Sequence, residues 1–405
     1  MNKIRNFPVQ LYFFYYVILY AGIAVYGGYI SIYYMKAGFS LSEIGTLTTI
    51  GPLFSLFVQP VWGMVSDRTR KRRLVLTAAL FGSSASVLLY SVHTGYLFYM
   101  FITMLFMLFY TAIQPLSDTI AVDYITRSGH NYSAVRVGGS IGFSIVVLLL
   151  GNFFNEHLNL LFLLCSGLLF LALITSCLLP KSEPSAAVNL PHTEEAEQKP
   201  FDKRKFVFLI CFSCVLFFAL SFNFNFVGIY AKQMTPSGTL LGVALCASSI
   251  SEVPVLILIT KFSRQFDRIN IVTIITAAGL LLGLRMLLYF FAQNIGMIIL
   301  AQTMQGITSM TIFYSMVTYI NREIPATHKA VGQSALVIAQ SGISSILGNI
   351  GGGYVSEWLG IRQTYLLIAG IVFAVTIFCG GLYMLRHNRT VLTFLSRLKK
   401  HRNKE

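Results

Sequence analysis

Long apolar runs separated by short polar segments make up most of this chain of 405 residues. A helix that crosses a membrane needs about 20 mostly apolar residues. Twelve runs meet this requirement, and each of them predicts a membrane-spanning helix. The predicted spans cover residues 9–34, 41–64, 74–92, 96–124, 133–152, 159–179, 206–231, 239–260, 270–291, 296–320, 330–355 and 363–385. The pattern therefore predicts an all-α membrane protein with twelve transmembrane helices.

Residues 180–205 interrupt this pattern and divide the spans into two sets of six. The segment contains four prolines and separate groups of acidic and basic side chains, which is typical of a flexible linker. We therefore expect an N-terminal half (1–179), a cytoplasmic linker (180–205), a C-terminal half (206–385) and a basic cytoplasmic tail (386–405). Two such halves favour a binding site near the middle of the membrane, with alternating access as one half rocks against the other.

The composition excludes most soluble classes of protein. Hydrophobic residues make up 55% of the chain and charged residues only 11%, whereas a soluble domain carries roughly a quarter charged residues. Membrane topology explains the net charge of +15. If both termini are cytoplasmic, 26 of the 30 Lys and Arg residues fall in cytoplasmic segments, only Lys36, Lys232 and Arg362 fall outside, and Arg285 lies within a span. We expect a multi-pass protein of the cell membrane with no nucleic-acid partner.

The chain offers no recognisable group of residues for metal or cofactor chemistry. Its six cysteines lie in apolar runs and are predicted to be small buried side chains, not disulfide partners. The sequence contains no phosphate-binding loop, no nucleophile elbow and no metal-ligand spacing. We expect no catalytic residue, no metal, no cofactor and no enzymatic activity. We expect a monomer whose partners are a small solute, protons and the lipid bilayer.

The turn after the second span carries a recognisable motif. Residues 63–72 read Gly-Met-Val-Ser-Asp-Arg-Thr-Arg-Lys-Arg and fit the pattern G-x-x-x-D-R-x-x-[RK]-[RK]. This turn resembles the signature loop of the major facilitator superfamily, and with twelve spans and a central linker the resemblance covers the whole chain. Arg70 departs from the pattern, because the family usually has Gly there.

The motif predicts gating residues on the cytoplasmic side. Gly63 is expected to allow close helix approach. Asp67 is expected to accept hydrogen bonds from a helix N-terminus or a neighbouring Arg in one conformation only, and Arg68 to gate with it. Asp267-Arg268, 200 residues later, follows the eighth span in the same way and indicates a duplicated ancestor.

Several charged residues fall inside the predicted spans, and four of them form possible pairs. Asp118 lies on span four, Arg136 one turn into span five, Glu252 on span eight and Arg285 on span nine. A charge at the bilayer centre costs at least about 2.5–3.5 kcal/mol, so each of these needs a partner or a wet cavity. Residue counts from the span ends place Glu252 within reach of Arg285, and Asp118 at the depth of Arg136. Asp123 would pair with Arg136 equally well; we expect Asp118 to face the cavity and Asp123 to lie at the cytoplasmic mouth.

Proton carriage is the chemistry that such pairs offer. The alternative is a structural salt bridge, but buried bridges add little stability over apolar packing, which favours a functional role. A buried carboxylate gains a proton when its arginine partner moves away and loses it when the pair forms again. We therefore expect Glu252, Arg285 and Asp118 to couple protons to transport.

The same residues carry a closer resemblance. Arg136-Val-Gly-Gly-Ser-Ile-Gly-Phe143 resembles the R-x-x-G-x-x-G-[WF] start of span five in the branch that holds lactose permease, nucleoside–proton symporters and the phenylpropionate permease. The spacings of 18 residues from Asp118 to Arg136 and 33 residues from Glu252 to Arg285 also match lactose permease. This resemblance implies that Asp118, Arg136 and Phe143 contact the solute.

The resemblance ends on span ten. Gln305 and Thr308 stand where lactose permease has a His and its proton-carrying Glu. Neither side chain titrates usefully, so the lactose cycle does not transfer intact and the proton must be carried by Glu252, Asp118 or Asp123.

Polar residues at mid-span are further candidates for contact with the solute. Tyr26 lies at the middle of the Tyr-rich first span, although helix packing explains it equally well. Asn223 and Asn225 on span seven must form hydrogen bonds across helices or to a ligand, and we favour the ligand. Gln305 is a similar candidate on span ten.

Together these features predict a secondary active transporter that takes up a small polar organic solute, such as a sugar, a nucleoside or an aromatic acid, with protons. The alternative is a proton-coupled efflux antiporter for drugs or metabolites. Such exporters often carry a Gly-Pro pair on span five, whereas Gly138, Gly139 and Gly142 have no proline among them. This absence favours uptake.

Overall fold

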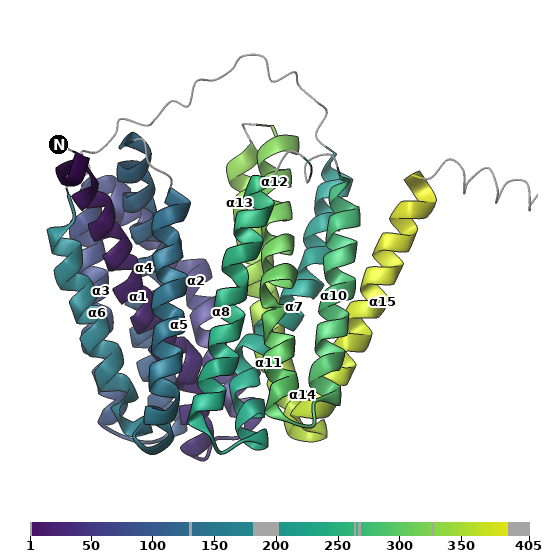
Figure 1. The fold of residues 1–405 in the computed structure, drawn as a ribbon, viewed down its shortest axis with the longest axis horizontal. Coiled ribbons are helices and arrows are strands. Elements are labelled where there is room, and N and C mark those ends of the chain that lie inside the picture. The colour runs from purple at the N-terminus through teal and green to yellow at the C-terminus, as the bar shows by residue number, and fades with distance from the viewer. Residues whose placement is uncertain are drawn as a thin grey trace, which may run out of the picture.

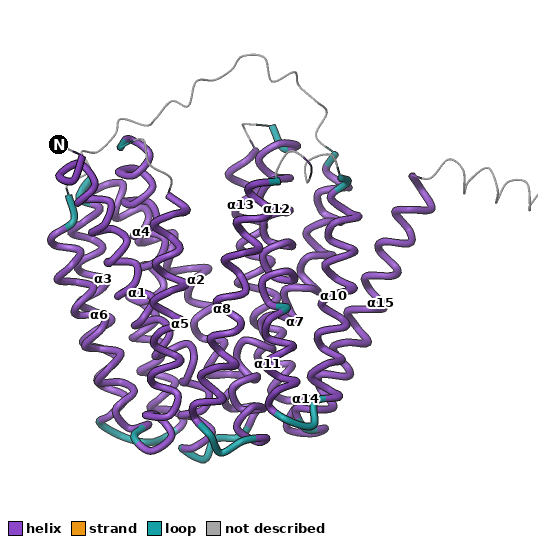
Figure 2. The backbone as a smooth tube through the Cα atoms, viewed as in Figure 1, coloured by secondary structure: helices purple, strands orange, loops and turns teal. Residues whose placement is uncertain are grey.

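The computed structural model describes most of the chain as helices, and the described residues contain no strand (Figure 2). The described residues are 2–128, 132–180, 202–262, 265, 269–325 and 328–387. Nearly all of the predicted linker and the predicted tail lie outside these ranges, as do Asp267 and Arg268.

The first half consists of six long helices and two short 3-10 turns. They are α1 (Asn2–Lys36), α2 (Leu41–Thr69), α3 (Arg72–Leu88), η1 (Leu89–Ser91), α4 (Tyr96–Arg127), α5 (Tyr132–Glu156), η2 (Leu158–Leu160) and α6 (Leu161–Leu178).

The second half interrupts two of its spans with π-helical turns, here η3, η5 and η6. Its elements are α7 (Lys203–Met234), α8 (Gly238–Lys261), α10 (Ile271–Phe291), α11 (Ile295–Thr303), η3 (Gly306–Met310), α12 (Thr311–Glu323), α13 (Lys329–Val337), η5 (Ile338–Ser344), η6 (Leu347–Gly351), α14 (Gly352–Leu359) and α15 (Ile361–His387). Such turns are rare and concentrate at functional sites.

Twelve helical segments in the described residues are long and apolar enough to cross a membrane, which confirms the predicted number. The tenth segment combines α11, η3 and α12, and the eleventh combines α13, η5, η6 and α14. Local sequence explains where several helices begin. Ser40 and Glu43 form a capping box at α2, and Asn270 and Asn294 cap α10 and α11 with their side chains.

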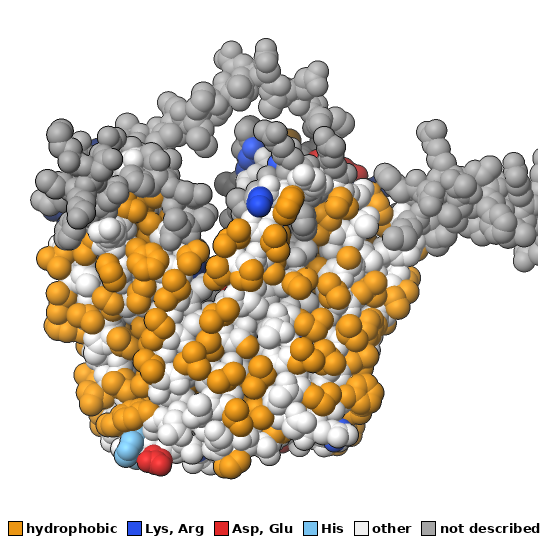
Figure 3. Space-filling model, viewed as in Figure 1, with side chains coloured by type: hydrophobic (Ala, Val, Ile, Leu, Met, Phe, Trp, Pro, Cys, Tyr) orange, Lys and Arg blue, Asp and Glu red, His pale blue; other side chains and the backbone are white. Residues whose placement is uncertain are grey.

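The two halves stand side by side, and their helices diverge toward one end of the bundle (Figure 1). Since α1 begins and α15 ends there, we call it the terminal end. Lys36, Lys232 and Arg362, the three cations predicted to lie outside, occupy helix ends at the opposite end. The visible face carries apolar side chains over most of its height, as a surface in contact with lipid requires (Figure 3).

The halves touch closely at the end opposite the terminal end, here called the closed end. A Cβ atom added at Gly151 of α5 would overlap the carbonyl oxygen of Gly238 at α8, and one added at Gly45 of α2 would overlap that of Asn349 on η6. Ser42 of α2 also donates its backbone N–H to Glu357 of α14 at 3.0 Å. Glycine is required at these contacts because the two backbones approach without room for a side chain.

The Gly151 contact predicts how the closed end responds to one added methyl group. Gly151→Ala should push α5 away from α8 and lower the thermal unfolding temperature, whereas Gly167→Ala on α6, where an added Cβ meets no atom of the described residues within 4 Å, should not. Spin labels at the exposed residues Ala37 and Gln293, in a variant without native cysteines, would report the separation by electron–electron distance measurement. Equal distances and equal stabilities in both variants would contradict the proposed tight contact.

Candidate functional site

A cavity of about 590 Å³ lies between the halves, bounded by α1, α2 and α4 on one side and by α7, α12, α13, η5 and η6 on the other. Its described walls are rich in hydroxyl and amide groups, and Asp118 is the only formally charged residue among them. The polar lining residues are Tyr26, Thr48, Ser55, Gln59, Tyr110, Thr111, Gln114, Asp118, Ser221, Asn225, Gln340, Ser341, Ser345 and Asn349.

Asp118 reaches this cavity from the middle of α4. Its Oδ1 accepts hydrogen bonds from the hydroxyl groups of Tyr16 at 2.6 Å and Tyr132 at 2.8 Å. These two tyrosines lie on α1 and α5, so they hold the carboxylate in place from neighbouring helices. A carboxylate with two hydroxyl donors keeps its charge at less cost than a bare one.

Arg136 lies on α5 and stacks on an aromatic ring. Its guanidinium carbon lies 4.2 Å from the centre of the Tyr20 ring, within the range of a cation–π contact. A Cβ at Gly139 would lie only 2.8 Å from Nη1 of Arg136, so this glycine leaves room for the guanidinium. Electrostatically, Arg136 interacts with Asp118 in its own half and with Glu252 in the other.

Glu252 lies on α8 and faces the tenth span. Its carboxylate accepts hydrogen bonds from the side chains of Gln305 and Ser309, the latter at 3.4 Å. It also interacts electrostatically with Arg136 and Arg285. Glu252 is therefore within electrostatic reach of an arginine from each half.

Arg285 is completely buried on α10, and neutral groups satisfy it. It donates to the Ala301 carbonyl at 2.8 Å, to Gln302 Oε1 at 2.8 Å and to the Tyr289 hydroxyl at 3.0 Å, and it also bonds Gln305. Sequence reasoning missed Gln302 and Tyr289. Their spacing in the sequence could have indicated them. Gln302 lies three residues before Gln305, and Tyr289 lies four residues after Arg285, and residues three or four apart share one face of a helix.

The expected direct ion pairs are not formed in this conformation. Among the described residues, neither Glu252 with Arg285 nor Asp118 with Arg136 lies within ion-pair distance. Gln305 stands between the first pair, because it contacts both the carboxylate and the guanidinium. Counting residues placed Glu252 and Arg285 within reach of one another but did not reveal the side chain that lies between the charges.

The two asparagines of α7 have different environments. Asn225 lines the cavity and donates to Asn349 Oδ1 at 2.9 Å, whereas Asn223 is buried and accepts from the Tyr365 hydroxyl at 3.1 Å. Two residues correspond to about 200° of helix rotation, so they face opposite sides. The preference for Asn223 as a ligand contact is therefore not supported by its position.

Asn349, which stands in the Gly-rich sequence Gly348-Asn-Ile-Gly351, is a cavity residue that the sequence did not point to. Its Oδ1 accepts from Ser221 and Asn225, and its Nδ2 donates to the Thr48 carbonyl at 3.3 Å. Since Thr48 belongs to α2, this completely buried side chain links the cavity wall of one half to the other half.

Of the remaining candidates for solute contact, one lines the cavity and two do not. Tyr26 lines the cavity and bonds the Tyr90 hydroxyl at 3.3 Å. Phe143 is half-buried against the hydrophobic core, and neither it nor Gln305 is among the described cavity-lining residues. Gln305 acts on Arg285 and Glu252 instead.

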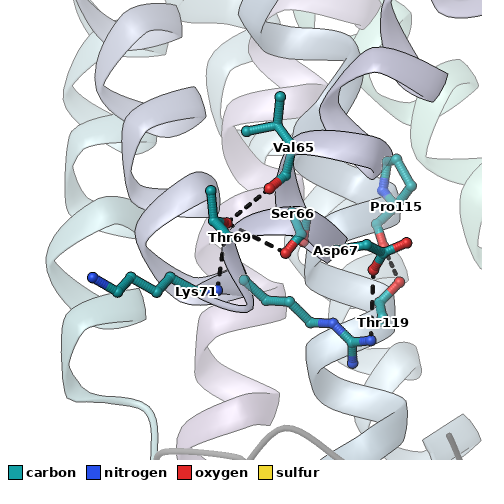
Figure 4. A network of polar contacts seen from close by, with 8 residues as sticks. Val65, Ser66, Asp67, Thr69, Lys71, Pro115 and Thr119 are labelled. Atoms are coloured by element: carbon teal, nitrogen blue, oxygen red, sulfur yellow. Dashed lines mark hydrogen bonds and ion pairs between the residues drawn. The ribbon is translucent and has the colours of Figure 1, made fainter.

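The turn between α2 and α3 lies at the terminal end, and Figure 4 shows it from close by. Asp67 Oδ1 lies 3.8 Å from Nη2 of Arg72 at the start of α3, so it has the neighbouring arginine that was expected. Arg70, at the usual glycine position, adopts the left-handed conformation with φ 54°. The close approach expected at Gly63 is absent here, since an added Cβ meets no described atom within 4 Å, as the divergence of the helices at this end explains.

The other predicted gating residues do not form one group with Asp67. Arg68 is exposed at the end of α2, and Asp123 lines a second cavity between α3, α4 and α6. Asp267 and Arg268 lie outside the described residues.

The sequence and the fold of this chain are similar to those of known transporters. The model of the family described as "MFS_1 like family" matches residues 9–367. The chain is 25% identical over 359 residues to the maltose permease of Geobacillus stearothermophilus, covering 88% of this chain and 89% of the permease. It is 23% identical over 329 residues to the uncharacterized transporter YwbF of Bacillus subtilis (strain 168), covering 80% and 81%.

A solved structure shares the fold. The nucleoside transporter NupG superposes with a TM-score of 0.78 at 15% sequence identity, over 93% of this chain and 99% of that chain. At this identity the likeness concerns the fold alone.

The opposite faces of α7 predict opposite effects for its two asparagines. Asn223→Ala leaves the buried Tyr365 hydroxyl without its acceptor and should lower the stability by about 1–3 kcal/mol. Asn225→Ala should leave the thermal unfolding temperature nearly unchanged and weaken the thermal stabilisation that a bound solute gives, in scans with sugars and nucleosides. Weaker solute binding by Asn223→Ala than by Asn225→Ala would contradict the assignment.

Proposed function

This chain belongs to the MFS_1-like family within the major facilitator superfamily of membrane transporters, and we propose that it takes up a small neutral polar solute together with protons. The observation that carries the proposal is the contact of the Glu252 carboxylate with Gln305 and Ser309, where Gln305 also bonds Arg285 of the second half and Arg136 of the first half is within electrostatic reach.

The composition of the cavity supports a neutral, hydroxyl-rich solute. Amide and hydroxyl groups can donate to and accept from such a solute, and the aromatic rings of Tyr26, Tyr110 and Phe224 offer flat apolar surfaces. An aromatic acid would need a cation, but Arg136 and Arg285 are not among the described lining residues. A sugar or a nucleoside fits best, which agrees with the names of the maltose permease and the nucleoside transporter.

The proton is proposed to bind at Glu252. When this carboxylate is charged, it attracts Arg136 across the interface and so holds α5 and α8 together near the membrane centre. When it takes a proton, that attraction is lost while the hydrogen bonds with Gln305 and Ser309 can remain. Protonation therefore changes the contact between the halves, as a coupling residue must.

We propose that Tyr20 connects Glu252 to Asp118 in the cavity. Its hydroxyl is buried and has no hydrogen-bond partner in the described part of the chain, and it interacts electrostatically with Asp118, Arg136 and Glu252. A water molecule at this hydroxyl would link the two carboxylates. Solute bound at Asp118 is thereby proposed to alter the charge balance at Arg136 and Glu252.

The terminal end is proposed to face the cytoplasm. Among the described residues, basic side chains at the terminal end include Arg68, Arg72, Lys203, Lys261, Arg322 and Lys329, whereas Lys36, Lys232 and Arg362 lie at the closed end. In this orientation the protein is a cell-membrane transporter whose outer end is shut by the glycine contacts.

Glu252→Gln tests the coupling role. Without a titrating group, uphill accumulation of solute should fall to simple equilibration, while exchange of internal for external solute continues, because the neutral amide mimics the protonated carboxyl group. Glu156→Gln, at an exposed acid at the end of α5, is the matched control. Uphill uptake by the Glu252 variant with unchanged proton movement would remove Glu252 from the cycle.

The direction of transport can be tested on cells in weakly buffered medium. A symporter should alkalinise the medium when its solute is added, and a panel of sugars, nucleosides and aromatic acids should reveal which solute does so. The alternative proton-coupled efflux antiporter would instead raise drug tolerance when overexpressed, without any solute-induced alkalinisation.

A further inference from the structure

A second cavity, larger than the central one, lies among α3, α4 and α6 toward the terminal end. Its volume is about 1090 Å³, and it shares no lining residue with the central cavity. This second cavity, here called the groove, has no role in the proposed transport cycle.

The inner wall of the groove is apolar and opens toward lipid. Leu74 and Phe81 of α3 and Phe170 of α6 line it and are 65%, 60% and 46% exposed. On helices that cross a membrane, such side chains face the acyl chains of the bilayer. The groove therefore offers an apolar path that continues into the surrounding lipid.

The rim of the groove at the terminal end is strongly basic. Arg70, Lys71, Arg72 and Arg73 are consecutive in the sequence and all line it, and Asp123 is the one carboxylate among the described lining residues. Asp67, outside the lining, offsets part of the charge of Arg72. The rim therefore keeps a clear excess of positive charge.

Helix α3 starts at this rim, and its N-terminus adds to the positive potential there. The N-cap residue of α3, Lys71, makes no side-chain capping hydrogen bond, and the first turn of this described helix contains no acidic residue. The unpaired N–H groups of a helix N-terminus favour a negatively charged group. Topology alone accounts for basic residues at a cytoplasmic turn, but not for an apolar groove directly beneath them.

We propose that this groove binds one anionic phospholipid, with the phosphate of its headgroup at Arg70–Arg73 and an acyl chain along Leu74, Phe81 and Phe170. A zwitterionic lipid carries no net charge and brings an ammonium group to a cationic rim, so it is the weaker ligand. The headgroup shares Arg72 with Asp67, which places the lipid in contact with the turn between α2 and α3.

The test uses the purified full-length protein in detergent, titrated with phosphatidylglycerol or with phosphatidylcholine of the same acyl chains. Native mass spectrometry counts the bound lipids. The wild type should retain one phosphatidylglycerol at least about tenfold more tightly than phosphatidylcholine. Arg70→Gln combined with Lys71→Gln should weaken this binding about ten- to thirty-fold.

Two further variants separate the groove from general charge effects. Ala78→Trp fills the groove from α3 with every charge in place, and it should also reduce phosphatidylglycerol binding. Lys203→Gln with Arg204→Gln removes two exposed charges at the start of α7, outside the groove, and should have no effect. Equal retention of the two lipids, equal loss in the α7 control, or full binding by both groove variants would overturn the proposal.

Discussion

Charged groups inside the membrane must be satisfied by their neighbours, and the rest of the site depends on how this chain meets that constraint. Arg285 is fully buried, yet its guanidinium is surrounded by neutral oxygens, including those of Gln302 and Gln305. Its positive charge is thus solvated but not cancelled by a direct ion pair. In the proposed cycle this charge responds to the state of Glu252, because the field between two charges is weakly screened in a low-dielectric interior.

The polar network and the closed end are physically connected. Asn349 bonds the cavity-lining Asn225 through one side-chain atom and the α2 carbonyl of Thr48 through another, and its own carbonyl oxygen packs against Gly45. A solute that displaces Asn225 therefore acts on a side chain that also joins the halves. Asn349 lies within the π-helical turn η6, and Gln305 directly precedes the π-helical turn η3, so both residues stand at irregular backbone.

The sequence alone predicted the twelve spans and placed the charged residues within them, because hydrophobic length and residue counts determine position along a spanning helix. It did not predict rotation about each helix axis. For that reason Asn223 and Asn225 were expected to act alike, although one packs against Tyr365 and the other lines the cavity. The intervening Gln305 and the role of Asn349 depend on which helices are neighbours, and that information comes only from the packed structure.

The most direct test of the central claim is the pH dependence of solute binding to the purified protein, measured by calorimetry with the proton exchange counted in two buffers. If Glu252 carries the coupled proton, binding should take up protons and the affinity should change by up to about tenfold per pH unit across the range in which Glu252 titrates. An affinity that is independent of pH, with no proton exchanged on binding, would contradict the account.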